Sequence, residues 1–310
     1  MNRLTRLCLM IALCALAAAD QGPSAAEGDS ALLLHTRVRK PVASDGEDAK
    51  YQVVEVERTW DPQKTALIIC DMWDDHWCKG AAGRVVEMAR PMNKVVQAAR
   101  DRGVLIVHAP STTVDFYRDT PQRKLAQSAP FAKTKAPLAT SPRWGTAWCW
   151  PDASREPELP IDDSDMGCDC AQKCEIREAW KRQIDLIDIA EGDAITDNGQ
   201  ELFNLFAERG IEHVMIMGVH LNMCVLGRPF AIRQLVQQGV DVVLVRDLTD
   251  TMYNHEKRPQ VDHFAGTDLV VEHVEKHWCP TILSTDLVGG QPFRFAEDTR
   301  PAKTAPAGGQ

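Results

Sequence analysis

The sequence predicts an α/β protein with a mostly parallel, doubly wound sheet and helices on both of its faces. Short, continuous apolar runs such as 66–70 (Ala-Leu-Ile-Ile-Cys) indicate strands that are buried on both faces. Between these runs, apolar residues recur at helical spacing. The two kinds of segment alternate along the chain, and repeated β-α-β units produce parallel strands.

Each element follows from its local pattern. The helix 85–99 has apolar residues three and four positions apart, and Gly103 ends it because glycine terminates helices at little cost. The helix 225–239 places Ile232, Leu235 and Val236 on one face. The remaining predicted elements are the helix 202–210 and the strands 104–107, 214–217 and 240–245.

The first residues indicate export. Arg3 and Arg6 precede an apolar run of about ten residues, and three alanines close this run before Asp20. This is the pattern of a secretory signal peptide, and the run is too short to span a bilayer as a helix. A retained membrane anchor is the alternative. We therefore expect residues 1–19 to be removed and the protein to be periplasmic or extracellular.

The net charge of the chain limits the classes of partner that it can bind. The formal net charge is −9, and removing residues 1–19 takes away two arginines and no acids, which leaves −11. Nucleic acids and anionic membranes bind basic faces, so neither is expected as a partner after signal removal. We expect a small-molecule substrate instead.

The remaining length suits one domain with an insertion. Residues 20–60 are predicted to be a polar leader with little core, 61–295 the α/β domain, and 296–310 a disordered tail. Residues 110–183 are rich in proline, tryptophan, aspartate and cysteine. They are interpreted as an insertion near the ligand end of the sheet, and the alternative is a solvated surface excursion.

Eight cysteines follow the predicted signal peptide, and three of them form a C-x-C-x-x-x-C run at 168–174. That run could bind zinc, but in an oxidising compartment we expect disulfides in preference to metal. The pairing cannot be assigned from spacing. The eight are Cys70, Cys78, Cys149, Cys168, Cys170, Cys174, Cys224 and Cys279.

Two residues at predicted strand ends carry a catalytic hypothesis, because open parallel sheets bind ligands beyond the carboxyl ends of their strands. Asp71 follows the strand 66–70, and Cys224 opens a predicted helix. The N–H groups and dipole at a helix start favour thiolate and can hold an oxyanion, while Asp71 could accept the thiol proton. The alternative is a small buried cysteine and a capping aspartate.

At these residues the chain resembles the isochorismatase-like cysteine hydrolase superfamily, which includes nicotinamidases and other small-amide hydrolases. Residues 218–225 (GVHLNMCV) are similar to its strand–turn–nucleophile segment, and 66–72 (ALIICDM) to the strand that delivers its aspartate. The likeness runs from about Thr65 to Asp286, outside the insertion. It implies a six-stranded, Rossmann-like sheet, an Asp–Lys–Cys triad and often a non-proline cis peptide, which here would join Val219 and His220.

The lysine of that triad has no basic counterpart at its expected position. Counting back from Cys224 places Glu191 there, and anchoring on the strand 192–195 places Asp197 there. An acidic residue would oppose thiolate formation. Lys181 and Arg182 are the nearest basic residues upstream, and they could serve only if the insertion folds back.

Four further residues are candidates for substrate binding. Trp73 could wall a pocket, although buried structural tryptophans are common. His220 and Asn222 lie close to the nucleophile in sequence. Arg228 is one turn past Cys224 and could face a substrate carboxylate or pair with a surface acid.

A second possible metal site, beyond the first strand, is implied by the nicotinamidase branch of the resemblance. Asp74, Asp75 and His76 follow Asp71, and His108 and His220 end other strands. Such a set could ligate a divalent ion, and a solvated acidic loop is the alternative. No cofactor is required.

The leading functional prediction is an exported hydrolase of a small amide or related C–N bond, acting through a thioester on Cys224. A catalytically inactive binding protein on the same fold is the first alternative, because the lysine position is acidic. A thiol redox or metal-handling protein is the second. The resemblance also implies a homo-oligomer.

Overall fold

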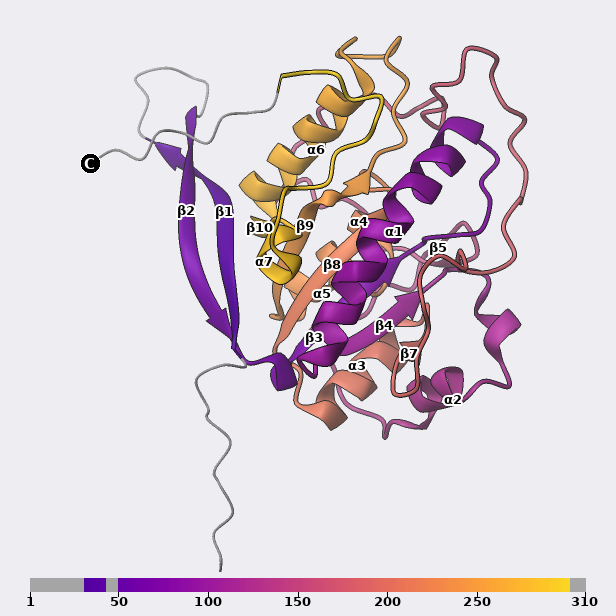
Figure 1. Ribbon diagram of the computed structural model, residues 1–310, viewed down its shortest axis with the longest axis vertical. Helices are drawn as coiled ribbons and strands as arrows, with labels where there is room; N and C mark the ends of the chain where they lie inside the picture. The colour runs from indigo at the N-terminus through magenta and orange to yellow at the C-terminus, as the bar shows by residue number, and fades with distance from the viewer. Residues whose placement is uncertain (1–30, 43–49, 302–310) are drawn as a thin grey trace, which may run out of the picture.

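The computed structural model describes residues 31–42 and 50–301, and shows a central sheet flanked by helices (Figure 1). The sheet has eight strands in the order β2-β1-β10-β9-β8-β3-β4-β7, and β5 (Pro142–Arg143) with β6 (Thr146–Ala147) forms a separate pair. The strands of the central sheet are β1 Leu32–Val42, β2 Lys50–Trp60, β3 Thr65–Cys70, β4 Leu105–Ala109, β7 Ala194–Ile195, β8 His213–Val219, β9 Asp241–Asp250 and β10 Thr281–Ile282.

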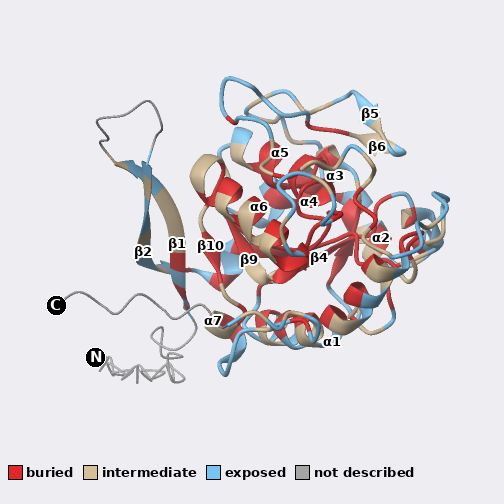
Figure 2. Ribbon diagram, turned by 90° about the horizontal axis from the view of Figure 1, so that it is seen from above, coloured by how far each residue is buried: buried red, intermediate tan, exposed pale blue. Residues whose placement is uncertain are grey.

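Helices cover both faces of the sheet, so the doubly wound α/β prediction is confirmed. Figure 2 shows α1 and α7 on one face and α3 and α5 on the other. Within the described residues, no helix is long and apolar enough to cross a membrane. The helices are α1 Lys79–Asp101, α2 Pro121–Ser128, α3 Gly199–Arg209, α4 Cys224–Gly227, α5 Ile232–Gln237, α6 His263–His277 and α7 Thr285–Val288, with short 3₁₀ turns at Pro62–Lys64 and Val114–Tyr117.

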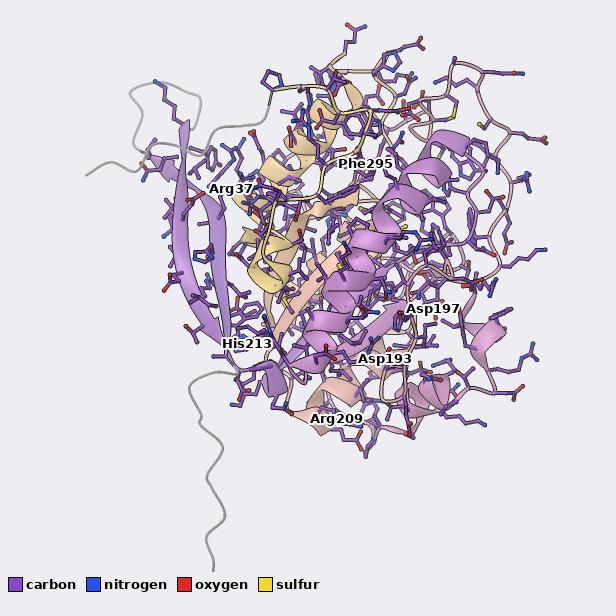
Figure 3. The ribbon with its side chains drawn as sticks, viewed as in Figure 1. Arg37, Asp193, Asp197, Arg209, His213 and Phe295 are labelled. Atoms are coloured by element: carbon purple, nitrogen blue, oxygen red, sulfur yellow. The ribbon has the colours of Figure 1, made fainter. Side chains whose placement is uncertain are left out.

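The predicted number of six strands is wrong, because a hairpin extends the sheet. Strands β10, β9, β8, β3, β4 and β7 are the six parallel ones, and β1 and β2 are antiparallel additions. Leu32, Leu34 and Trp60 of the hairpin are buried, so the prediction of little core in 20–60 also fails there. Arg37, labelled in Figure 3, ion-pairs with Glu275 of α6. The hairpin therefore docks partly through charged contacts, which an apolar-run criterion overlooks.

The predicted helix 225–239 is two short helices. Arg228 and Pro229 separate α4 from α5, and the backbone of Arg228 is extended, with φ −64° and ψ 156°. A residue before proline avoids the helical region, and proline itself has no N–H to donate. Cys224 consequently opens a single helical turn instead of a long helix.

The insertion 110–183 is anchored to the helices beside the nucleophile. Trp148 is buried and covers Gly227 so closely that a Cβ at Gly227 would lie 2.4 Å from the indole ring. Glu156, also buried, accepts hydrogen bonds from Arg233 of α5 at 2.7 Å and from His273 of α6 at 2.8 Å. The insertion is thus packed onto the domain, and a wholly solvated excursion is ruled out.

We expect Glu156→Gln to destabilise the protein by about 3–5 kcal/mol, because Arg233 would remain buried without its counter-charge. Burial raises the pKa of Glu156, but the hydrogen bonds from His273 and Arg233 outweigh this and lower it from 4.5 to about 2. Because the folded pKa is depressed, the contribution is fully present above about pH 4.5 and is lost as the pH falls through about 2. Urea unfolding of both proteins at neutral pH and down to pH 3 measures this. A constant difference over that range would contradict the assignment.

Candidate active site

The nucleophile candidate and its aspartate lie at neighbouring strand ends. Asp71 follows β3 with φ 50°, and Cys224 follows β8 across a turn that contains a cis peptide between Val219 and His220. That cis bond is the one implied by the resemblance. Gly218 has φ +121°, and a Cβ there would lie 2.1 Å from the Cys70 carbonyl oxygen. Only glycine therefore allows β8 to pass this closely to β3 as it enters the turn.

Cys224, Asp71 and Arg228 form a continuous buried contact. The Cys224 thiol interacts with the Asp71 side chain and with the charge of Arg228. One oxygen of Asp71 accepts the backbone N–H of Ser111 at 2.8 Å, and the other accepts Arg228 Nε at 3.1 Å. Asp71 is fully buried and Arg228 is 1% exposed. The prediction that Arg228 faces a substrate carboxylate or a surface acid is therefore wrong, since its acidic partner is Asp71.

The insertion fixes the other side of Arg228. Its Nη1 donates to the Trp144 carbonyl oxygen at 3.2 Å and to Thr146 Oγ1 at 2.5 Å. Burial lowers the pKa of Arg228, but the charges of Cys224 and Asp71 raise it further than burial lowers it. The site therefore holds a permanent positive charge next to the thiol and the carboxylate.

The surroundings of the Cys224 thiol oppose its ionisation. Burial, followed by the negative charge of Asp71, raises its pKa to about 12, while Arg228 and the His220 backbone N–H act in the opposite direction. The expected depression of this pKa by a helix dipole is therefore wrong. The helix α4 is one turn long, and the sulfur is enclosed at 3% exposure.

Of the four residues considered for the lysine position, Asp197 is the one that interacts with the site. Glu191 and Lys181 are exposed, and Arg182 pairs with Asp74 and Asp185. Each of these three is therefore directed toward solvent or toward a different carboxylate.

Asp197 lies two residues beyond β7 and interacts with the charges of Asp71 and Arg228. Figure 3 labels it together with Asp193, which precedes the same strand. Its carboxylate accepts the Thr112 backbone N–H at 2.9 Å. Burial, with the charge of Asp71, raises the pKa of Asp197. The positive member of the site thus comes from Arg228, after the nucleophile, and sequence reasoning assigned that residue to the substrate.

Trp73 lies in the loop that follows Asp71, and its predicted role in substrate binding stays a prediction. It is 5% exposed, donates from Nε1 to the Ser111 carbonyl oxygen at 3.1 Å, and stacks on Trp180 with ring centroids 4.6 Å apart. Ser111 therefore joins Trp73 to Asp71, since its N–H holds the carboxylate and its carbonyl holds the indole.

His220 and Asn222 have different environments around the nucleophile. The His220 ring is buried, its Nε2 has no hydrogen-bond partner among the described residues, and burial lowers its pKa well below the usual value. Asn222 donates to Asp163 at 2.9 Å and to the Met252 carbonyl at 3.1 Å, and accepts the Met252 N–H at 2.9 Å. Asn222 therefore holds the turn before Cys224 against Met252 and Asp163. A substrate that contacted the Asn222 side chain would have to displace one of these hydrogen bonds.

Arg143 and Asp163 are site neighbours that sequence reasoning missed. The Arg143 guanidinium lies 3.9 Å from the ring centroid of Trp144 and interacts electrostatically with Asp163 and Cys224. A cavity of about 370 Å³ adjoins this region, and Asp163 is among its lining residues. Cys224 does not line that cavity. Arg143 and Asp163 both lie within the insertion 110–183, where the sequence contains no motif of the resembled family.

The structure does not bring Asp74, Asp75 and His76 together as metal ligands. Asp74 accepts the Lys181 backbone N–H at 2.9 Å, Asp75 pairs with Lys79 at 2.6 Å, and His76 Nδ1 accepts the Cys78 backbone N–H at 3.2 Å. Each group already has its own partner.

The histidine from β4 is also engaged elsewhere. His108 Nε2 lies 3.1 Å from Asp193, and its Nδ1 lies 3.0 Å from Gln183. Among the described residues, the side chains close enough to share a metal ion are instead Cys78, Cys168 and Cys170.

The chain was compared with known proteins. No family model and no curated protein matches it. Similar solved structures include a cysteine hydrolase from Pseudomonas syringae pv. phaseolicola (15% identity over 74% of this chain and 93% of that one, TM-score 0.45). Others are an isochorismatase from Pseudomonas putida (12%, 74% and 92%, TM-score 0.43) and a pyrazinamidase of Pyrococcus horikoshii in complex with zinc (16%, 71% and 99%, TM-score 0.38). Similarity at this level leaves the activity open, so the function is inferred from the chain's own residues.

Proposed function

We propose that this chain is an isochorismatase-like cysteine hydrolase that cleaves a small amide or a related C–N bond. The observation that carries the proposal is the buried contact of Cys224, Asp71 and Arg228. It supplies a nucleophile, a proton acceptor and a fixed positive charge in one enclosed place.

The chemistry follows from these contacts. Asp71 accepts the thiol proton as Cys224 attacks the substrate carbonyl carbon, and Arg228 stabilises the negative charge as it forms. Backbone N–H groups around Cys224 hold the oxyanion. The C–N bond then breaks, the proton passes from Asp71 to the departing amine, and an acyl thioester remains on Cys224. Water, deprotonated by Asp71, hydrolyses the thioester and restores the thiol.

Arg228 can serve where the family uses a lysine. A guanidinium stays charged at all physiological pH values and can bond several acceptors in fixed directions, as Arg228 does with Asp71, Trp144 and Thr146.

The proposed location and partners of the enzyme are based on the sequence. We propose that residues 1–19, which lie outside the described residues, direct export, so that the enzyme works outside the cytoplasm. The partner is a small-molecule substrate, and neither nucleic acid nor membrane suits the acidic mature chain. Every step above uses protein groups and water, so no cofactor is required. We further propose a homo-oligomer.

A binding protein without turnover is the second candidate, because Cys224 is 3% exposed and its pKa is raised. The distinguishing experiment is a panel of small amides, with ammonia or amine release measured together with intact-protein mass after rapid quenching. Turnover with an acyl adduct on Cys224 supports the hydrolase. Amides that bind without release or adduct support the binding protein. Exchange of Cys224 with a partner thiol, without either, would indicate the redox alternative.

Alkylation of Cys224 should be slow at neutral pH and should accelerate as the pH rises toward about 12, the pKa of the thiol. Asp71→Asn removes the negative charge that raises this pKa, so it should speed labelling at neutral pH, whereas Arg228→Gln should slow it. Iodoacetamide labelling read by peptide mass spectrometry measures each rate. Fast labelling of the unmodified protein at neutral pH would show that the thiol is already activated and contradict this account.

A further inference from the structure

Three cysteine sulfurs meet at the start of α1, away from the nucleophile, and a fourth cysteine, Cys174, follows them in the same segment. Cys78 directly precedes the helix, and the other three come from the segment 168–174 of the insertion. The sulfurs of Cys78, Cys168 and Cys170 all lie within 4.8 Å of one another, and those of Cys78 and Cys170 are 3.8 Å apart. The Cys174 thiol interacts electrostatically with Cys168. Chain segments about ninety residues apart thus contribute sulfurs to one cluster.

A backbone N–H group at the start of α1 contacts one of these sulfurs. The Gly80 N–H donates to Cys170 Sγ at 3.2 Å. Lys79 and Gly80 belong to the first turn of a 23-residue helix, where N–H groups have no partners within the helix. Such N–H···S bonds stabilise thiolates and orient them as metal ligands.

The absence of a side chain at Gly80 lets the cysteine segment pack against the start of α1. A Cβ on Gly80 would lie 2.7 Å from an Asp169 oxygen and 3.5 Å from the Cys170 sulfur, so a side chain there would push the cysteine segment away. Asp169 itself is held by Arg84 at 2.7 Å and by His263 at 3.2 Å. Its carboxylate therefore holds the segment against α1, and the sulfurs of Cys78, Cys168 and Cys170 lie together as a donor set, with Cys174 available as a fourth.

We propose that Cys78, Cys168, Cys170 and Cys174 bind one zinc ion. Four thiolates suit the tetrahedral preference of zinc, and a full set of protein ligands is characteristic of a structural site. Binding releases the remaining thiol protons to solvent. The geometry favours metal over the disulfides expected from the sequence. The 3.8 Å between the Cys78 and Cys170 sulfurs matches the ligand separation of a tetrahedral site with Zn–S bonds of about 2.3 Å.

The zinc would join the insertion to the loop between β3 and α1. That loop contains Trp73 and His76, whose rings lie next to Trp180 and His220 at the candidate active site. The metal would therefore fix the position of one wall of the site without touching the reacting atoms.

The test is metal analysis of the full-length chain, purified under reducing conditions without chelator. We expect about one zinc per chain, released by a thiol-directed mercurial, and a tetrahedral cobalt–thiolate absorption after exchange with cobalt. Cys170→Ser and Cys174→Ser should lower the zinc content at least about tenfold. Cys149→Ser is the matched control, because Cys149 is a free, buried cysteine of the same insertion outside the cluster. A chelator should lower the Tm of the wild type and of Cys149→Ser.

Several results would overturn the proposal. These are zinc-free protein whose four cluster thiols are alkylated equally fast with and without added zinc, a disulfide within the cluster detected by peptide mass, or equal loss of zinc in Cys149→Ser. Should Cys170→Ser fail to fold, two measurements still decide: Cys174→Ser, which alters a partly exposed residue, and zinc titration of the demetallated wild type.

Discussion

Cys224→Ala should abolish hydrolysis of any amide that the protein turns over, lowering kcat by about 10⁴-fold or more. The reason is that Cys224 is the proposed nucleophile beside Asp71 and Arg228. The neighbouring Cys70 thiol also interacts with both charges, but it is fully buried and donates to the Val219 carbonyl oxygen at 3.7 Å. The substitution removes one buried atom from a small side chain, so the fold should survive. Activity assays and acyl-adduct mass spectrometry on the same preparations measure the effect.

The matched control for this substitution is Cys279→Ala. Cys279 is also buried and free, at 4% exposure, but it lies next to β10 and outside the site. It should leave kcat unchanged. Activity that persists in Cys224→Ala would remove the thioester mechanism, whatever the substrate. Loss of activity in both variants would indicate a packing effect.

Arg228→Gln should lose both stability and turnover. Asp71 would stay fully buried without its counter-charge, which costs about 3–5 kcal/mol. Turnover should fall by about 10²- to 10³-fold, because a preorganised charge no longer stabilises the forming thiolate. Arg228→Lys should recover part of both, since it restores the charge but not the bonds to Trp144 and Thr146. Urea unfolding and steady-state kinetics measure the two effects separately.

Arg182→Gln is the control, because Arg182 is the half-buried arginine that sequence reasoning offered as a replacement for the lysine. It pairs with Asp74 and Asp185, so we expect a change in stability within about 0.5 kcal/mol and no change in kcat. If Arg182→Gln impaired turnover while Arg228→Gln did not, the positive charge of the site would have been assigned to the wrong residue.

The sequence was informative where one local pattern determines the structure. The apolar run before Asp71 and the segment leading to Cys224 placed both residues at strand ends, because buried parallel strands need continuous apolar residues. The hairpin β1–β2 was missed because its inner face is partly charged and alternating. The break at Pro229 was readable from the sequence, yet the apolar face of 225–239 dominated the prediction.

Tertiary contacts were beyond sequence reasoning. The pairing of Arg228 with Asp71 joins residues 157 positions apart, and the cysteine cluster joins Cys78 to Cys170 across 92 positions. Neither pairing has a spacing signature. The pKa of Cys224 was predicted in the wrong direction, because burial and a neighbouring carboxylate depend on what the fold brings around the sulfur.

The hydrogen bonds between the insertion and Arg228 affect how such a protein can change over evolution. In many α/β enzymes the loops above the sheet are exchangeable modules that alter specificity while the sheet retains the chemistry. Here the Trp144 carbonyl and the Thr146 hydroxyl hold the arginine that faces the nucleophile. Specificity and catalysis are therefore not separable parts, and a new loop grafted into this place would have to bring its own acceptors for the guanidinium.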